Sequence, residues 1–215
     1  ALDESTGEVL WTHEWRTSYR MLQVSYAIGP RATPTVDGDR VYIVGATGRL
    51  FCFDVATGEV IWEKDYVAEY DTSVPVWGIV TSPLVDGDRV ITVIGSEPDG
   101  LVAAFDKRTG ELLWSHDLVT DFDAPPTLIR PAVKAGYAAS PTAYRDLVIV
   151  TAGGPGQAVM AFRQDDGVLV WRSGSFLISP ATPILVDVDG QTQLIVYGGQ
   201  TINGLDPATG AVIWT

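Results

Sequence analysis

One short motif returns five times along this chain, and a repeat of this kind constrains the fold more than any other feature of the sequence. Its clearest copies read Asp-x-x-Thr-Gly-x-x-x-Trp, and in every copy the first residue precedes the tryptophan by eight positions. A second motif, Ser/Thr-Pro at the head of a valine-rich run, precedes four of the copies. The chain is therefore expected to be an array of one repeated structural unit.

Each repeat predicts four short antiparallel strands. In the first complete repeat the strands are expected at 32–36, 40–44, 49–54 and 59–64, with glycine-containing turns between them. Valine, isoleucine, threonine and aromatic residues suit strands, and no stretch shows a sustained period of 3.6 residues. Four strands per repeat, separated by strong turn signals, describe a blade of an all-β propeller.

The repeats predict complete blades at 32–64, 81–116, 139–172 and 181–215. Residues 1–15 are expected to supply only the end of one strand and the outer strand of a further blade. Because no segment is left over to close the ring, residues 1–215 are predicted to form a partial β-propeller.

The motif residues have a physical role in this fold. One small sheet cannot bury its own hydrophobic face, so each blade must be covered by the next. A large flat ring at the same place in every outer strand supplies that cover, which predicts that these tryptophans pack between blades: Trp11, Trp62, Trp114, Trp171 and Trp214. The Asp and Thr of the turn are expected to bond to backbone amides, and its Gly to adopt a left-handed conformation, at Asp54, Thr57, Gly58, Asp106, Thr109, Gly110, Asp206, Thr209 and Gly210.

Charge and composition exclude several classes of function. The net charge is −13, with 27 acidic against 14 basic residues, so the chain would repel a phosphate backbone and nucleic-acid binding is not expected. Cys52 is the one cysteine, which rules out an internal disulfide. No run of 18 apolar residues is present, so no transmembrane segment is expected.

The segments between blades are the expected place for a ligand. They run over about 16–31, 65–80, 117–138 and 173–180, and the first three are longer than typical loops. Aromatic and arginine side chains over a concave centre are typical of binding surfaces; the alternative is that these loops only cover the propeller core. The candidate ligand-face residues are Tyr19, Arg20, Tyr26, Arg31, Tyr70, Trp77, Asp123, Arg130 and Tyr137.

Three weaker patterns are interpreted as structural. The run 153–156 is glycine-rich but lacks the Lys-Ser/Thr of a phosphate loop, so it is predicted to be a turn between strands. The segment 187–190 is faintly similar to a calcium loop and is predicted to be a hairpin. His13 and His116 each follow a blade tryptophan by two positions, and we expect both on the surface of outer strands, too far apart for a metal pair or a catalytic triad.

The two motifs together resemble the pyrroloquinoline-quinone-type propeller repeat over nearly the whole chain. The strings Pro75-Val76-Trp77-Gly78 and Ala135-Gly136-Tyr137 are similar to uncharacterised bacterial envelope members of that family, which are related to the outer-membrane assembly propeller lipoprotein. The resemblance implies a ring of seven or eight blades in the periplasm or cell envelope. The chain would then be about half of the ring, and the missing blades would be needed to close it.

Three functions remain open, the first two from the resemblance and the third because aromatic-rich faces suit sugars. The first is a non-catalytic binding or scaffold platform that holds a protein or small-molecule ligand on its loop face, without a cofactor, a metal or catalytic residues. The second is a fragment of a quinone-dependent dehydrogenase with a calcium-bound quinone, an Asp base and a stacking Trp, for which Trp77 and Asp123 are nominal candidates although the chain lacks adjacent cysteines. The third is a propeller that binds or cleaves carbohydrate, whose hydrolytic form needs two carboxylates about 5–10 Å apart.

Overall fold

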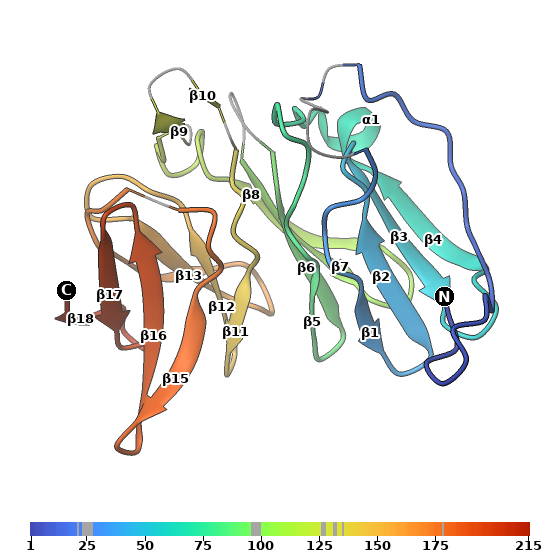
Figure 1. Ribbon diagram of the computed structural model, residues 1–215. Helices are drawn as coiled ribbons and strands as arrows, with labels where there is room; N and C mark the ends of the chain where they lie inside the picture. Colours follow the sequence, from blue (N-terminus) through green and yellow to red (C-terminus); the bar gives the residue numbers. More distant parts are fainter. Residues whose placement is uncertain are drawn as a thin grey trace.

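The fold is known from a computed structural model. It describes residues 1–20, 22, 28–95, 100–125, 128–130, 133–134, 136–177 and 179–215, with the side chains left out in two short strands, β9 and β10. Four antiparallel sheets of four strands each stand side by side in chain order (Figure 1). The predicted all-β architecture of four-stranded propeller blades is therefore confirmed.

Within each sheet the strands pair in sequence order, from the innermost to the outermost. The first sheet contains β1 (Thr35–Asp37), β2 (Arg40–Val44), β3 (Arg49–Asp54) and β4 (Val60–Asp65). The second contains β5 (Leu84–Asp86), β6 (Arg89–Ile94), β7 (Leu101–Asp106) and β8 (Leu112–Asp117). The third contains β11 (Thr142–Tyr144), β12 (Leu147–Thr151), β13 (Val159–Arg163) and β14 (Leu169–Ser173). The fourth contains β15 (Ile184–Val188), β16 (Gln191–Gly198), β17 (Thr201–Leu205) and β18 (Val212–Trp214).

The hydrophobic core lies between the sheets. Alternate residues of a strand point to opposite faces, so a blade flanked on both sides buries its middle strands on both faces. In the first sheet Tyr42 and Cys52 belong to the cluster shared with the second sheet, whereas Val41 and Phe53 pack against Trp11 of the N-terminal segment. Similar clusters join the second sheet to the third and the third to the fourth.

Hydroxyl groups of the Ser/Thr-Pro motif join the inner strands of successive blades. The amide of Thr33 donates to Ser82 Oγ at 2.9 Å, and the amide of Ser82 donates to Ser140 Oγ at 2.9 Å. The amide of Ser140 in turn donates to Thr182 Oγ1 at 3.0 Å. Each hydroxyl thus gives the neighbouring blade an acceptor for a backbone N–H that its own sheet does not use.

The blade tryptophans lie against the turn of the following blade. Trp62, Trp114 and Trp171 are 9%, 8% and 8% exposed, whereas Trp214 is 41% exposed. The indole N–H donates to a backbone carbonyl one residue past the start of the next motif, at Val55 for Trp11, Lys107 for Trp62, Gln164 for Trp114 and Pro207 for Trp171. Trp214 donates within its own sheet, to Gln193 Oε1 at 2.8 Å, and with Tyr197 and Ile202 it forms the exposed outer face of the fourth sheet.

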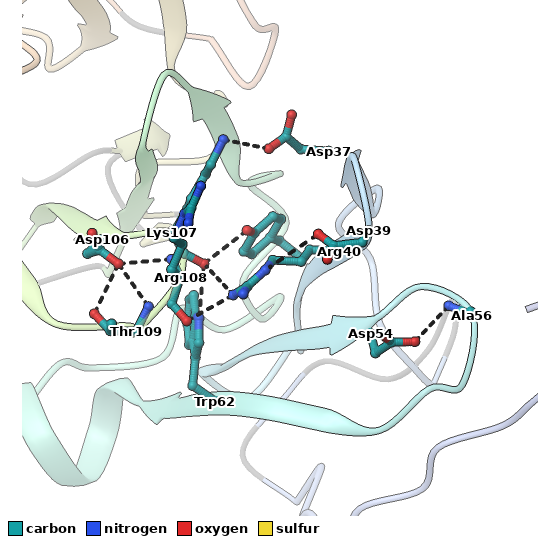
Figure 2. A network of polar contacts seen from close by, with 11 residues as sticks. Asp37, Asp39, Arg40, Asp54, Ala56, Trp62, Asp106, Lys107, Arg108 and Thr109 are labelled. Carbon is teal, nitrogen blue, oxygen red and sulfur yellow. Dashed lines mark hydrogen bonds and ion pairs between the residues drawn. The ribbon is translucent and has the colours of Figure 1, made fainter.

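The backbone carbonyl of Lys107 is the centre of a polar network between the first and second blades (Figure 2). The Lys107 oxygen accepts from Trp62 Nε1 at 3.1 Å, Tyr42 Oη at 3.0 Å and Arg40 Nη1 at 3.3 Å. The Lys107 ammonium group reaches back to Asp37 Oδ2 at 2.8 Å. Four polar contacts therefore join the first blade to a single residue of the second.

The Asp-x-x-Thr-Gly turns close on their own side chains. Asp54 Oδ1 accepts from the Ala56 amide at 3.0 Å, the Thr57 amide at 2.8 Å and the Thr57 hydroxyl at 3.0 Å. The Asp106 turn repeats this pattern with the Thr109 amide and hydroxyl. The Thr57 and Thr109 amides hold the pKa of these two carboxyl groups below its usual value. In the Asp206 turn, Asp206 Oδ1 accepts from the Ala208 amide at 2.7 Å, and Thr209 Oγ1 accepts from the Ala211 amide at 3.3 Å. Gly210, between Thr209 and Ala211, has a φ of 74°.

The two histidines, which we expected on the surface, are half-buried against aromatic rings. The ring of His13 lies 4.8 Å from that of Phe53, and the ring of His116 stacks 5.1 Å from that of Phe162 in the next blade. His116 Nε2 also donates to the Gly167 carbonyl at 2.7 Å. The physical reason is the two-residue period of a strand, which places a residue two positions after the tryptophan on the same covered face.

Candidate ligand face at the loop end

The long links between blades lie at one end of the sheets, together with the turns that join the two middle strands of each blade. The helix α1 (Tyr66–Tyr70) follows β4 directly, and its first amide donates to the Gly48 carbonyl at 2.8 Å. The next link contains the hairpin of β9 (Leu128–Arg130) and β10 (Val133–Lys134), at the upper end of the molecule in Figure 1. We call this end the loop face. In the described part of the chain, no helix is long and apolar enough to cross a membrane.

Two of the candidate aromatic residues pack inward. Tyr137 is 4% exposed and covers Gly100, where a Cβ atom would meet the ring at 2.1 Å. The Tyr70 ring lies 6.0 Å from that of Phe105 and is partly buried. Both rings thus help to close the core beneath the loop face.

The remaining candidates occupy varied positions. Arg31 and Trp77 are half-buried, and the Arg31 guanidinium donates to the Trp77 carbonyl, which ties the first link to the second. Tyr19 is half-buried, whereas Arg20 and Asp123 are exposed. Tyr26 lies outside the described residues, and Arg130 lies in β9, where only the backbone is described. The structure thus brings together Arg31 with Trp77, but it shows no single cluster of all candidates in its described part.

The carboxylates of the loop face bind backbone amides. Asp65 caps α1 by accepting from the Ala68 amide at 3.1 Å, and Glu69 accepts from the Asp65 amide at 2.8 Å. In the next link Asp117 accepts from the Val119 amide at 2.8 Å, and Asp121 accepts from the Asp117 amide at 3.0 Å. These acidic groups fix the conformation of the links.

A pocket of about 530 Å³ opens on this face, beside α1. It is bounded by the first link, by the turn between β2 and β3, and by α1. Thr17 and Thr47 join two of these walls through a hydroxyl–hydroxyl contact of 2.6 Å. Sequence reasoning did not single out any of its lining residues, which are Arg16, Thr17, Ser18, Leu22, Thr47, Arg49, Asp65, Val67, Ala68 and Val74.

A second cavity, of about 500 Å³, is apolar and lies in the seam between the N-terminal segment and the first sheet. Trp11, Trp15, Val36 and Phe53 are among its lining residues. Val36 is 61% exposed there, because the N-terminal segment covers only part of the sheet.

Comparison with known proteins places this fold in a family. A family model described as "Outer membrane protein assembly factor BamB" (PQQ_2) matches residues 1–134 and 127–215. The chain belongs to this family. The resemblance to the pyrroloquinoline-quinone-type repeat, and to members related to the outer-membrane assembly protein, is thereby confirmed.

The relatives compared in sequence and structure are longer than this chain. "Outer membrane protein assembly factor BamB" of Yersinia pestis is 22% identical over 223 residues, which cover 100% of this chain and 50% of that protein. The crystal structure of BamB from Moraxella catarrhalis aligns with a TM-score of 0.61 at 20% identity and covers 99% of this chain and 53% of that one. The quinohemoprotein alcohol dehydrogenase from Comamonas testosteroni aligns with a TM-score of 0.71 at 18% identity and covers 99% and 39%. At these identities the solved structures show a shared fold, and the chain spans about half the length of the BamB relatives.

The residues of the chain can be compared with what a calcium-bound quinone would require. In the described ranges, no group of three or more His, Cys, Asp or Glu side chains could hold a metal ion. Asp123 is exposed and its backbone carbonyl accepts from Gln157 Nε2 at 3.1 Å, and the Trp77 carbonyl is bonded to Arg31. The sole cysteine, Cys52, is fully buried in a blade seam. The described residues therefore show no ligand set for a calcium ion.

Proposed function

We propose that the protein containing this chain is a non-catalytic binding platform of the bacterial envelope, facing the periplasm, and that it holds a protein partner on its loop face. Membership of the BamB-type family supports the compartment and the class of role. We also propose that residues 1–15 are the end of a further blade and that additional blades complete the ring. The bond from Trp11 Nε1 to the Val55 carbonyl supports this, because it repeats the bonds of the later tryptophans.

The observation that carries the non-catalytic role is the state of the loop-face carboxylates. General acid–base chemistry or metal binding needs carboxylates that are directed at a shared ligand. Asp65, Glu69, Asp117 and Asp121 instead accept from backbone amides of their own links. Residues 65–69 and 117–121 are thus held by their own side chains, which suits recognition of a partner better than a chemical step.

A complementation experiment tests this function. A strain that lacks the gene should become permeable to large antibiotics, and the full-length protein should restore the barrier. The double variant Arg20→Glu/Asp123→Lys, which changes two exposed loop-face charges, should fail to restore it although the protein accumulates normally. Arg108→Glu, an exposed charge at the opposite end of the sheets, should restore it fully.

The dehydrogenase alternative gives a different result. If the full-length protein, supplied with pyrroloquinoline quinone and calcium, reduced a dye in an alcohol-dependent reaction, the non-catalytic role would be wrong. Full complementation by the loop-face double variant would separately reject the loop face as the binding surface.

A further inference from the structure

The pocket beside α1 has a polar rim on one side and an aliphatic wall on the other. Arg16, Thr17 and Ser18 approach from the first link, and Thr47 and Arg49 from the turn and strand opposite them. Val67 and Ala68 of α1, with Val74, form the aliphatic part of the lining. Val67 is 45% exposed, which is unusual for a valine in a half-enclosed site and leaves apolar surface for a ligand.

The two guanidinium groups of the pocket differ in their charge balance. Arg49 Nε lies 3.3 Å from Asp65 Oδ2, and its Nη1 lies 4.0 Å from Glu63 Oε2, so its charge is compensated. Arg16 is exposed and makes no ion pair or hydrogen bond with any described residue. Arg16 is therefore the guanidinium of the pocket lining that has no carboxylate partner among the described residues.

Two hydroxyl groups line the same pocket as Arg16 and can bind an anion. In the contact between Thr17 Oγ1 and Thr47 Oγ1, at 2.6 Å, one hydroxyl donates and the other keeps its own hydrogen. The hydroxyl that accepts within the pair does not use its own hydrogen there and can donate it to a ligand oxygen. A guanidinium and a hydroxyl donor that line one pocket are a favourable combination for a carboxylate.

We propose that this pocket binds a single carboxylate joined to a short aliphatic group, with the carboxylate at Arg16 and the Thr17–Thr47 pair and the aliphatic group against Val67 and Val74. The inference rests on the proposed binding role of the loop face and names the chemistry that it recognises. A dianion such as phosphate fits less well, because one of its charges would remain uncompensated beside Asp65. Such a carboxylate could belong to a free branched-chain acid or to the aliphatic C-terminal residue of a peptide.

Titration of the 15N-labelled full-length protein tests the proposal. The probes are acetyl-glycyl-leucine, 4-methylpentanoate, acetyl-glycyl-leucine amide and inorganic phosphate. The two carboxylates should give saturable shifts of the Thr17, Thr47 and Ala68 amide resonances, whereas the uncharged amide should not and phosphate should bind at least about tenfold more weakly. Tighter binding of the acetylated dipeptide would identify a peptide terminus as the natural source, and tighter binding of 4-methylpentanoate would identify a free acid.

Matched variants separate the site from general charge effects. Arg16→Gln should raise the Kd of both carboxylates about tenfold or more, because a charge-assisted contact is lost, while Arg108→Gln removes the same charge elsewhere and should leave the Kd unchanged. Val67→Glu should abolish binding, and Val170→Glu, at a similarly exposed valine of β14, should not. Absence of saturable shifts, or an unchanged Kd in the Arg16 variant, would overturn the proposal. Because this readout needs no partner protein, its failure is distinguishable from failure in the complementation experiment.

Discussion

Replacement of Trp62 by alanine tests the role of the tryptophans in joining the blades. The side chain is 9% exposed and its ring lies over Gly110, where an added Cβ would be 2.8 Å from a ring atom. Trp62→Ala should lower the free energy of unfolding by about 3–5 kcal/mol, as other large-to-small changes of buried aromatic residues do. Urea titration followed by far-ultraviolet circular dichroism measures this without depending on tryptophan fluorescence.

The hydrogen bonds around Lys107 indicate how the loss of unfolding free energy divides between packing and hydrogen bonding. When the indole N–H is removed, the Lys107 carbonyl keeps the Tyr42 hydroxyl and Arg40 as donors, so no buried acceptor is left unsatisfied. Most of the loss should therefore come from packing, and Trp62→Phe should cost less than the alanine variant. Trp214→Ala is the matched control, because its ring is 41% exposed and has no following blade in the chain. A loss below about 1 kcal/mol for Trp62→Ala, or an equal loss for the two alanine variants, would refute the packing role.

Three further predictions concern the turns and the exposed face. Gly110→Ala should destabilise the chain more than Gly156→Ala, because φ is 73° and 72° at the two positions but only Gly110 has a tryptophan ring against it; equal urea midpoints would contradict this. The Thr109 amide is the main cause of the lowered pKa of Asp106, which predicts a contribution to stability above the usual pKa of 3.8 that is lost as the pH falls through the folded value. Asp106→Asn should lessen this acid-dependent loss of stability in thermal melts, and an unchanged pH profile would count against it. The exposed outer face that carries Trp214 should cause the isolated chain to dimerise or aggregate. Sedimentation in about 0.15 M salt, where charge repulsion is screened within about 8 Å, measures this, and a single stable monomer peak is the opposing result.

Much of the blade could be predicted because its signals are local. The strands expected at 40–44 and 49–54 have those bounds in the structure, since a glycine turn limits each end and alternation of side chains defines the middle. The innermost strand begins later than expected, at Thr35, because the Ser/Thr-Pro residues ahead of it bond to neighbouring blades instead of to their own sheet. The first outcome follows from local turns, whereas the second depends on a bond from Thr33 to Ser82 in the next blade.

The loop face could not be predicted in the same way. The pocket walls at Arg16, Thr47 and Val67 come from three segments of different repeats or links, and no periodic pattern joins them. The inward positions of Tyr70 and Tyr137 likewise depend on cavities over Phe105 and Gly100, which form only when neighbouring segments pack. The half-buried position of His116 is a different case, because the two-residue period of the strand was sufficient to place it on the covered face.

The hydroxyl-to-amide bonds that join Thr33, Ser82, Ser140 and Thr182 have an evolutionary consequence. Ser82 and Ser140 each offer an amide to the blade after them and a hydroxyl to the blade before them, whereas Thr33 offers the amide and Thr182 the hydroxyl. A duplication of any whole repeat, wherever its ends fall, would therefore introduce one new amide and one new hydroxyl, and every junction would remain matched. An insertion or deletion of half a repeat would leave an incomplete sheet, which could not place its Ser/Thr-Pro residue beside those of both neighbouring blades. The unit by which such a propeller can gain or lose length is thus the complete repeat.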